Sequence, residues 1–502
     1  MEKIVVFVHG WNVTHTKTYG KLPRRLANEA PGYDLSIKTE EIFLGRYISF
    51  HDEVQLQDIA RAFQTAVNDQ LGHLLEEDRR FICITHSTGG PVVREWWRRY
   101  YQDQGEDGRL CPMSHLIMLA PANFGSALAV LGKGKVSRLR QWFAGIEPGQ
   151  GVLDWLCLGS DQAWDLNKHW IESDGRHIGP EGVFPFVITG QTIDRRLYDN
   201  LNSYTGESGS DGVIRVAAAN LQAKYVRLVQ SPPQDGLDED GFLPIRLDEN
   251  KSSTSHEVPL AIVEGKSHSG DEKGIMLSVS PRKGVRKDAQ TVRAIFDCIN
   301  VESSDNYEQL VSDFSRLSAE TQEKELVEIE HTFVRSERYF FHDRYSMVIF
   351  RVTDSEGNRV EDFDLYLTSG AESDRNHLPR GFFADRQQNP NSPNVVTYFF
   401  NHSKMTNCPP IVLGRETVRQ AHEGATLLGL EVIARPGSGF ARYHPGKIAA
   451  STVILEQFLV PNATTLVDIV LNRIVGEETF RLNQGTYTRD FSKTEPGAPL
   501  RD

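Results

Sequence analysis

The chain has 502 residues, of which 39% are hydrophobic and 25% charged, and its formal net charge is −13. A single hydrophobic core stops growing at roughly 250–300 residues, so two domains are expected. The acidic balance disfavours a nucleic-acid partner and adsorption to anionic membranes, because both need a basic surface. The five cysteines are scattered without metal-ligand spacing, so we expect neither a disulfide framework nor a zinc site.

The N-terminal sequence predicts neither a targeting leader nor a membrane span. The segment "MEKIVVFVHGW" enters an apolar strand at residue 4 and has no small-residue cleavage site. No segment approaches the roughly 18 apolar residues that a spanning helix needs. We therefore expect a cytoplasmic protein, or one exported without a cleavable signal peptide, with no transmembrane segment.

Strand-like and helix-like patterns alternate up to about residue 300. Strands are expected at 3–10, 35–45, 80–86, 114–122, 183–190 and 258–265, and helices at 21–30, 54–77 and 88–101. Strands that alternate with helices pair in parallel through right-handed crossovers. Residues 1–300 therefore predict an α/β domain, with a mostly parallel sheet between two layers of helices.

The pattern changes after residue 300. A polar helical stretch at 301–330 precedes strand-like segments in 331–485, which are separated by Pro, Gly and Asn. Two of these strands, within 345–370, are joined through a Ser-Glu-Gly-Asn turn. We expect a helical linker, then a C-terminal β-rich, sandwich-like domain, and a flexible tail at 486–502.

The stretch "THSTGGP" joins a buried strand to a helix. A serine at such a corner is presented at the carboxyl end of the sheet, beside the outward-pointing N–H groups of the helix. The flanking positions must be small, and Thr85 crowds the turn where Gly89 does not. The pattern predicts Ser87 as a nucleophile. The N–H groups of Thr88 and of Trp11, in the His-Gly-Trp end of the first strand, are the expected oxyanion donors.

Two further segments supply an acid and a base. Asp211, in "SGSDGV", is favoured over Asp194 as the acid that orients the base. His268 lies in the loop after the last apolar strand of the domain and is favoured over His256 as the base. The order serine, acid, histidine is that of an α/β-hydrolase.

With "VFVHGW", "THSTGG", "LAPANFGSALA" and "SDGVIRVAAANL", residues 1 to 280 resemble the α/β-hydrolase superfamily, in particular its lipase and phospholipase branch. The resemblance implies a three-layer α/β-hydrolase fold and hydrolysis of carboxylic esters, lipid esters above all, through an acyl-enzyme. It assigns Ser87 as the nucleophile, His268 as the base and Asp211 as its orienting acid. No cofactor and no metal are expected.

An insertion at about 124–182 follows the strand at 114–122 and, in this fold, lies over the site. It carries basic residues at 133–140 and the aromatic residues Trp142, Phe143, Trp155, Trp164 and Trp170. Aromatic side chains mixed with Lys and Arg suit a cap that meets a lipid interface. We expect a large acyl pocket under this cap and transient membrane contact, with at least half of the tryptophans forming the cap's own core.

Two other functional hypotheses stay open. In one, the chain is a leaderless bacterial phospholipase effector that attacks membranes. In the other, it is a catalytically inert adaptor that binds a protein through its C-terminal β domain, although the intact candidate triad speaks against this. The sequence specifies neither the partner of the β domain, nor the head group preferred, nor the oligomeric state.

Overall fold

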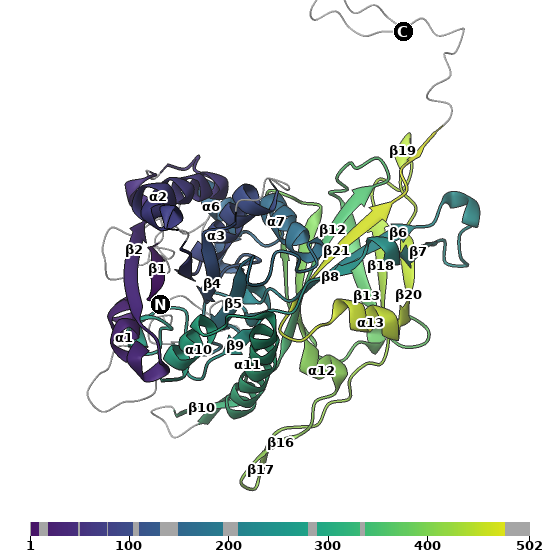
Figure 1. The fold of residues 1–502 in the computed structure, drawn as a ribbon. Helices are drawn as coiled ribbons and strands as arrows, with labels where there is room; N and C mark the ends of the chain where they lie inside the picture. The colour runs from purple at the N-terminus through teal and green to yellow at the C-terminus, as the bar shows by residue number, and fades with distance from the viewer. Residues whose placement is uncertain are drawn as a thin grey trace, which may run out of the picture.

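The computed structural model describes residues 2–9, 19–48, 51–77, 79–103, 110–130, 149–193, 209–279, 289–331 and 337–476. These residues form an α/β unit, on the left in Figure 1, beside a β-rich unit on the right. No helix among them is both long and apolar enough to cross a bilayer. The predicted tail lies outside the described residues.

The first sheet has the strand order β2-β1-β3-β4-β5-β9, and all of its neighbouring strands are parallel. The strands are β1 (Lys3–His9), β2 (Ile37–Phe43), β3 (Phe81–His86), β4 (Met113–Leu119), β5 (Phe184–Thr189) and β9 (Leu260–Ile262). The central strands are short apolar runs, which suits a sheet buried on both faces. Parallel pairing brings their carboxyl ends to one edge, where the candidate residues follow them.

Helices cover both faces of this sheet. Successive side chains of β1 point to opposite faces, so they belong to two different cores. Ile4 and Val6 share one core with helices on their side, namely α2 (Leu56–Glu76), α3 (Gly89–Trp97), α6 (Gln150–Leu156) and α7 (Asp161–Glu172). Val5 and Phe7 share the other core with α1 (Leu22–Glu29), α10 (Ala289–Ile299) and α11 (Ser304–Lys324). The three predicted layers are present.

The second sheet follows the path β13-β18-β20-β7-β6-β21-β12-β15-β14, with β8 paired to β6. Its strands are β6 (Ala223–Gln230), β7 (Leu243–Leu247), β8 (Ser253–Thr254), β12 (Tyr345–Asp354), β13 (Phe363–Thr368), β14 (Phe383–Gln388), β15 (Val395–Asn401), β18 (Leu428–Ala434), β20 (Gly446–Ser451) and β21 (Thr464–Leu471). Around it lie short elements: α9 (Val216–Ala219), α12 (His402–Thr406), α13 (Thr452–Phe458), and the strand pairs β10 (Val327–His331) with β11 (Glu337–Phe341), β16 (Ile411–Leu413) with β17 (Glu416–Arg419), and β19 (Ala441–Arg442) with β22 (Ile474–Val475).

This sheet folds over itself and also packs on the α/β unit. Val348 and Phe350 of β12 share a core with Leu430 of β18, so the two ends of the strand path face each other as in a sandwich. Met347 and Ile349, on the opposite face of β12, belong to the core that contains α6 and α7. The alternation of β12 therefore joins the two units through a continuous apolar contact.

The structure corrects the expected boundary at residue 300. Strands β6, β7 and β8 lie within 223–254, yet they belong to the second sheet. β6 pairs in parallel with β21, from Ala223 opposite Thr464 to Val229 opposite Val470. The chain therefore crosses to the β-rich unit and returns to the first sheet at β9.

One further expectation needs correction. The segment expected to be a linker contains α11, whose Tyr307 and Phe314 are buried in the core under the first sheet. This helix is therefore part of the α/β unit. Strands β12 and β13, which the 355–358 turn joins, do not pair with each other, since β12 lies between β21 and β15 and β13 pairs with β18. A turn sequence does not specify the partner of each strand.

Candidate active site

Ser87 occupies the corner between β3 and α3. Its φ is +53°, a left-handed conformation that costs a non-glycine residue free energy and is held here by its surroundings. The N–H of Ser87 donates to the Leu119 carbonyl at 3.1 Å, and the N–H of Ala122 donates to the Ser87 carbonyl at 3.2 Å. These two bonds tie the corner to the end of the neighbouring strand, β4.

The packing at this corner explains how a threonine can occupy the position two residues before the serine, where glycine is usual. Thr85 is fully buried, and a Cβ added to Gly89 would lie 3.2 Å from the Thr85 Cβ. Thr85 fits because position 89 has no side chain. Gly90 is more tightly enclosed, since an added Cβ would lie 2.8 Å from the Cβ of Pro121. The two glycines let α3 begin directly beside the strand.

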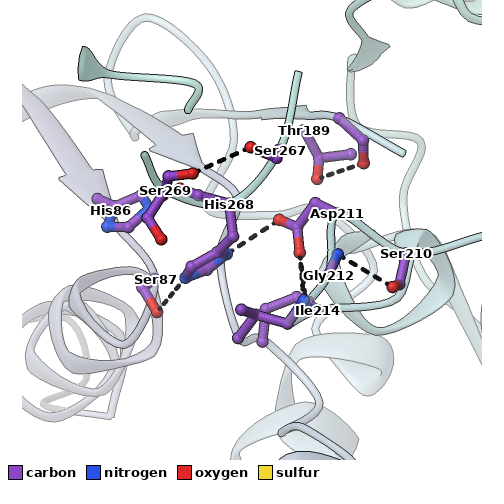
Figure 2. Close-up of polar contacts among 12 residues, drawn as sticks. His86, Ser87, Thr189, Ser210, Asp211, Gly212, Ile214, Ser267, His268 and Ser269 are labelled. Atoms are coloured by element: carbon purple, nitrogen blue, oxygen red, sulfur yellow. Dashed lines mark hydrogen bonds and ion pairs between the residues drawn. The ribbon is translucent and has the colours of Figure 1, made fainter. Parts of the chain in front are cut away.

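His268 lies between Ser87 and Asp211 (Figure 2). With the proton on Nδ1, His268 donates to Oδ2 of Asp211 at 2.9 Å, and its Nε2 accepts from Oγ of Ser87 at 3.0 Å. These are the two contacts that a serine hydrolase triad requires. The three side chains follow β3, β5 and β9, so the parallel sheet brings them together from distant segments.

The loop that carries Asp211 is closed on itself. The second oxygen of Asp211, Oδ1, accepts the N–H groups of Val213 at 3.0 Å and Ile214 at 2.7 Å. The main-chain carbonyl of Asp211 accepts the N–H of His268 at 2.9 Å. From the other side, the Ser126 hydroxyl donates to the Val213 carbonyl at 2.7 Å. The carboxylate is therefore fixed before any substrate arrives.

His86, the residue before Ser87, supports the loop of His268. Its Nε2 lies 3.1 Å from the carbonyl oxygen of His268, and the centroids of the two imidazole rings are 4.6 Å apart. Burial, and then the neighbouring His268, lower the pKa of His86 well below its usual 6.5. His86 is therefore neutral at pH 7 and donates to that carbonyl through Nε2–H.

The three residues of the candidate triad are buried. Ser87 is 8% exposed and His268 1%, whereas Asp211 has no exposed surface. Burial of this kind strengthens the hydrogen bonds along the chain from carboxylate to hydroxyl, because water does not screen them. His9, at the end of β1, is also buried, and burial lowers its pKa to about 4.

Of the other predicted site residues, one lies beside Ser87, and the rest lie elsewhere or outside the described residues. Thr88 is the residue before the first turn of α3, where a helix presents unsatisfied N–H groups. Trp11 and Asp194 fall outside the described residues. His256, the alternative base, stacks on Tyr307 of α11 at a centroid distance of 6.4 Å and does not join the triad.

The described part of the predicted cap is packed against the second sheet. Trp155, Trp164 and Trp170 are each at most 5% exposed, and the guanidinium of Arg351 lies 4.2 Å from the ring centroid of Trp164. The basic residues, Trp142 and Phe143 lie outside the described residues, so the acyl pocket stays a prediction. A cavity of about 760 Å³ lies between α10 and α11, and no triad residue lines it. In the described chain, no cluster of three His, Cys, Asp or Glu side chains is arranged to hold a metal ion.

Comparison with solved structures identifies the family. Phospholipase PlaB from Legionella pneumophila is 41% identical to this chain, covers 97% of it over 97% of its own length, and superposes with a TM-score of 0.82. The same phospholipase in complex with thio-NAD gives 40% identity, 97% coverage of both chains and a TM-score of 0.80. No protein-family model and no curated protein matches the sequence. The chain belongs to the PlaB family.

Membership of the PlaB family confirms the predicted α/β-hydrolase fold, followed by a β-rich C-terminal region. It also confirms the prediction of an ester hydrolase from the lipase and phospholipase branch. An inert adaptor does not fit this assignment.

In this PlaB-family enzyme, sequence reasoning missed two residues beside the triad. His86 could have been found from its place next to Ser87, at the edge of the sheet where His268 was expected. Arg215 follows the Asp211 loop, and its side chain contacts Asp385 and Phe399 of the second sheet. No local signal reveals that contact, because Asp385 is 170 positions further along the chain.

Proposed function

We propose that this chain hydrolyses the carboxylic ester bonds of phospholipids, with Ser87 as nucleophile, His268 as general base and acid, and Asp211 as the acid that orients it. The observation that carries the proposal is the chain of hydrogen bonds from Ser87 Oγ through His268 to Asp211, at 3.0 and 2.9 Å. The relative's identity as a phospholipase supports the substrate class.

The reaction begins when His268 Nε2 removes the hydroxyl proton of Ser87 as Oγ bonds to the ester carbonyl carbon. Asp211 keeps the proton on Nδ1 and stabilises the imidazolium that forms. The carbonyl oxygen becomes an oxyanion, for which the N–H groups of Thr88 and Trp11 are the proposed donors. The ester bond to the alcohol then breaks, and the imidazolium gives its proton to the departing lysophospholipid oxygen.

The second half of the reaction releases the acid. Water attacks the acyl-enzyme carbonyl while His268 removes its proton, and the Ser87 oxygen leaves and takes that proton back. The products are one fatty acid and one lysophospholipid per turnover. The helix that begins at Gly89 adds a favourable field for the oxyanion, because its N-terminus carries partial positive charge.

The substrate class is tested with phosphatidylcholine and phosphatidylglycerol vesicles, and triacylglycerol emulsion as a comparison. Wild-type protein should release fatty acid and lysophospholipid in equal amounts. Ser87→Ala should lower kcat by about 10⁶-fold, because the nucleophile is absent. Circular dichroism of the variant serves as the control for folding. Release of diacylglycerol or phosphatidic acid in place of fatty acid would contradict ester hydrolysis.

A further inference from the structure

The loop of Asp211 ends at a residue that reaches into the second sheet. The loop closes through the main-chain bridge between Ser210 and Arg215, and the N–H of Val216 donates to the Gly209 carbonyl at 3.0 Å. Arg215 is therefore the closing residue of the turn that presents the acid to His268 (Figure 2 shows the turn from Ser210 to Ile214).

The side chain of Arg215 crosses the junction between the two units. Its guanidinium lies 3.3 Å from the ring centroid of Phe399 on β15. Its Nη2 is 3.4 Å from Oδ2 of Asp385 on β14. Arg215 is only 7% exposed and Phe399 1%. Cation–π contacts strengthen when both groups are removed from water, so this stack holds the short loop of Asp211 firmly against the second sheet.

Other contacts hold the same loop against the second sheet. Gly209 is in the left-handed region, with φ of +77°, and an added Cβ would lie 2.6 Å from the ring of Tyr345 on β12. The hydroxyl of Thr464 on β21 donates to the Ala217 carbonyl at 2.7 Å. The loop therefore rests on the second sheet on one side and meets His268 on the other.

We infer that Arg215 is a positioning residue for the triad: by stacking on Phe399 and pairing with Asp385, it holds the loop so that Asp211 stays within hydrogen-bond distance of His268. The inference rests on the proposed function. A misplacement of about 1 Å in a catalytic constellation costs roughly 10²-fold in rate. The second sheet thereby acts on catalysis without supplying a group that touches substrate.

The test compares Arg215→Ala with a matched control at the same junction, Arg351→Ala. The guanidinium of Arg351 also stacks on an aromatic ring, that of Trp164, but α7 carries no proposed triad residue. We expect Arg215→Ala to lower kcat for phosphatidylcholine by about 10- to 100-fold with KM unchanged. Arg351→Ala should lower Tm and leave kcat within about twofold. Arg215→Lys should recover part of kcat, because a lysine ammonium also stacks on an aromatic face.

Two further readouts separate positioning from general destabilisation. The downfield proton resonance of the His268–Asp211 hydrogen bond should be present in wild-type protein and lost in both Asp211→Asn and Arg215→Ala. Phe399→Leu removes the aromatic face while keeping an apolar side chain, so it should reproduce the kcat loss even if Arg215→Ala folds poorly. The double variant Arg215→Ala/Phe399→Leu should have a kcat no lower than that of the slower single variant.

The outcomes distinguish this inference from the proposed function. The positioning role is overturned if Arg215→Ala and Phe399→Leu keep full kcat, or if Arg351→Ala loses kcat to the same extent. In either case an inactive Ser87→Ala would leave the proposed function intact. If Ser87→Ala retains phospholipase activity, the triad itself is wrong and the inference falls with it.

Discussion

At the scale of single residues, the two oxygens of Asp211 have separate tasks. Oδ2 accepts from His268, and Oδ1 accepts two main-chain N–H groups of its own loop. Both oxygens must therefore be acceptors. An amide in the same place has only one oxygen and cannot satisfy both sets of donors.

Asp211→Asn tests this division directly. If the amide oxygen keeps the two main-chain donors, its NH₂ group faces Nδ1 of His268 and forces the proton onto Nε2, which then cannot accept from Ser87. We expect kcat to fall by about 10⁴-fold with KM little changed. Steady-state kinetics on phosphatidylcholine vesicles measure it. Activity within tenfold of wild type would mean that another acid orients the base.

Local sequence signals predicted the candidate residues Ser87, Asp211 and His268, because each lies at the end of an apolar run or in a recognisable turn. The same signals did not reveal Arg215 or the carbonyl contact of His86. Both depend on which segments meet in space, and no pattern within a few residues encodes that.

At the scale of elements, the corner from β3 to α3 depends on Gly90. The sequence predicted the strand, the turn and the helix, but not the space available beside the helix. That space is set by Pro121 and Met118 of the neighbouring strand and its loop. An added Cβ would lie 2.8 Å from the proline Cβ and 3.2 Å from the Met118 sulfur.

Gly90→Ala should therefore destabilise the protein by about 1–3 kcal/mol through overpacking, against a gain of up to about 1 kcal/mol from helix propensity. The matched control is Gly72→Ala on α2, where an added Cβ meets nothing within 4 Å. That variant should be neutral or more stable. Urea denaturation measures both, and equal stability of the two variants would contradict the close packing at the corner.

At the scale of the whole molecule, the two units share a core, and the chain passes between them more than once. The change in composition after residue 300 predicted two units, yet β6 and β7 lie far before it. The Tyr225 hydroxyl on β6 donates to Asp468 on β21, 243 positions away, at 3.1 Å. Pairing over such a separation is decided by packing, so the sequence pattern alone could not assign these strands.

Buried neutral histidines make the stability of the whole molecule depend on pH. Burial lowers the pKa of His9 and of His115 to about 4, from the 6.5 of an exposed imidazole. Between these values the unfolded chain binds protons that the folded chain does not, so stability is complete above pH 6.5 and falls as the pH drops toward 4. At pH 5, each of these histidines should lower the free energy of unfolding by about 2 kcal/mol.

Denaturant unfolding at pH 7, 6 and 5 measures this loss. His115→Gln keeps a donor for the Val301 carbonyl, which lies 2.8 Å from Nε2 of His115, but it cannot titrate. Its stability should fall less steeply between pH 7 and pH 5 than that of wild-type protein. Identical pH dependence in the two proteins would exclude His115 as a contributor.

Labelling with a fluorophosphonate probe, with the adduct mapped by peptide mass spectrometry, tests whether Ser87 is the nucleophile. We expect one phosphonylated peptide, containing Ser87, in wild-type protein, and no adduct in Ser87→Ala. An adduct on a different serine, or equal labelling of Ser87→Ala, would contradict it.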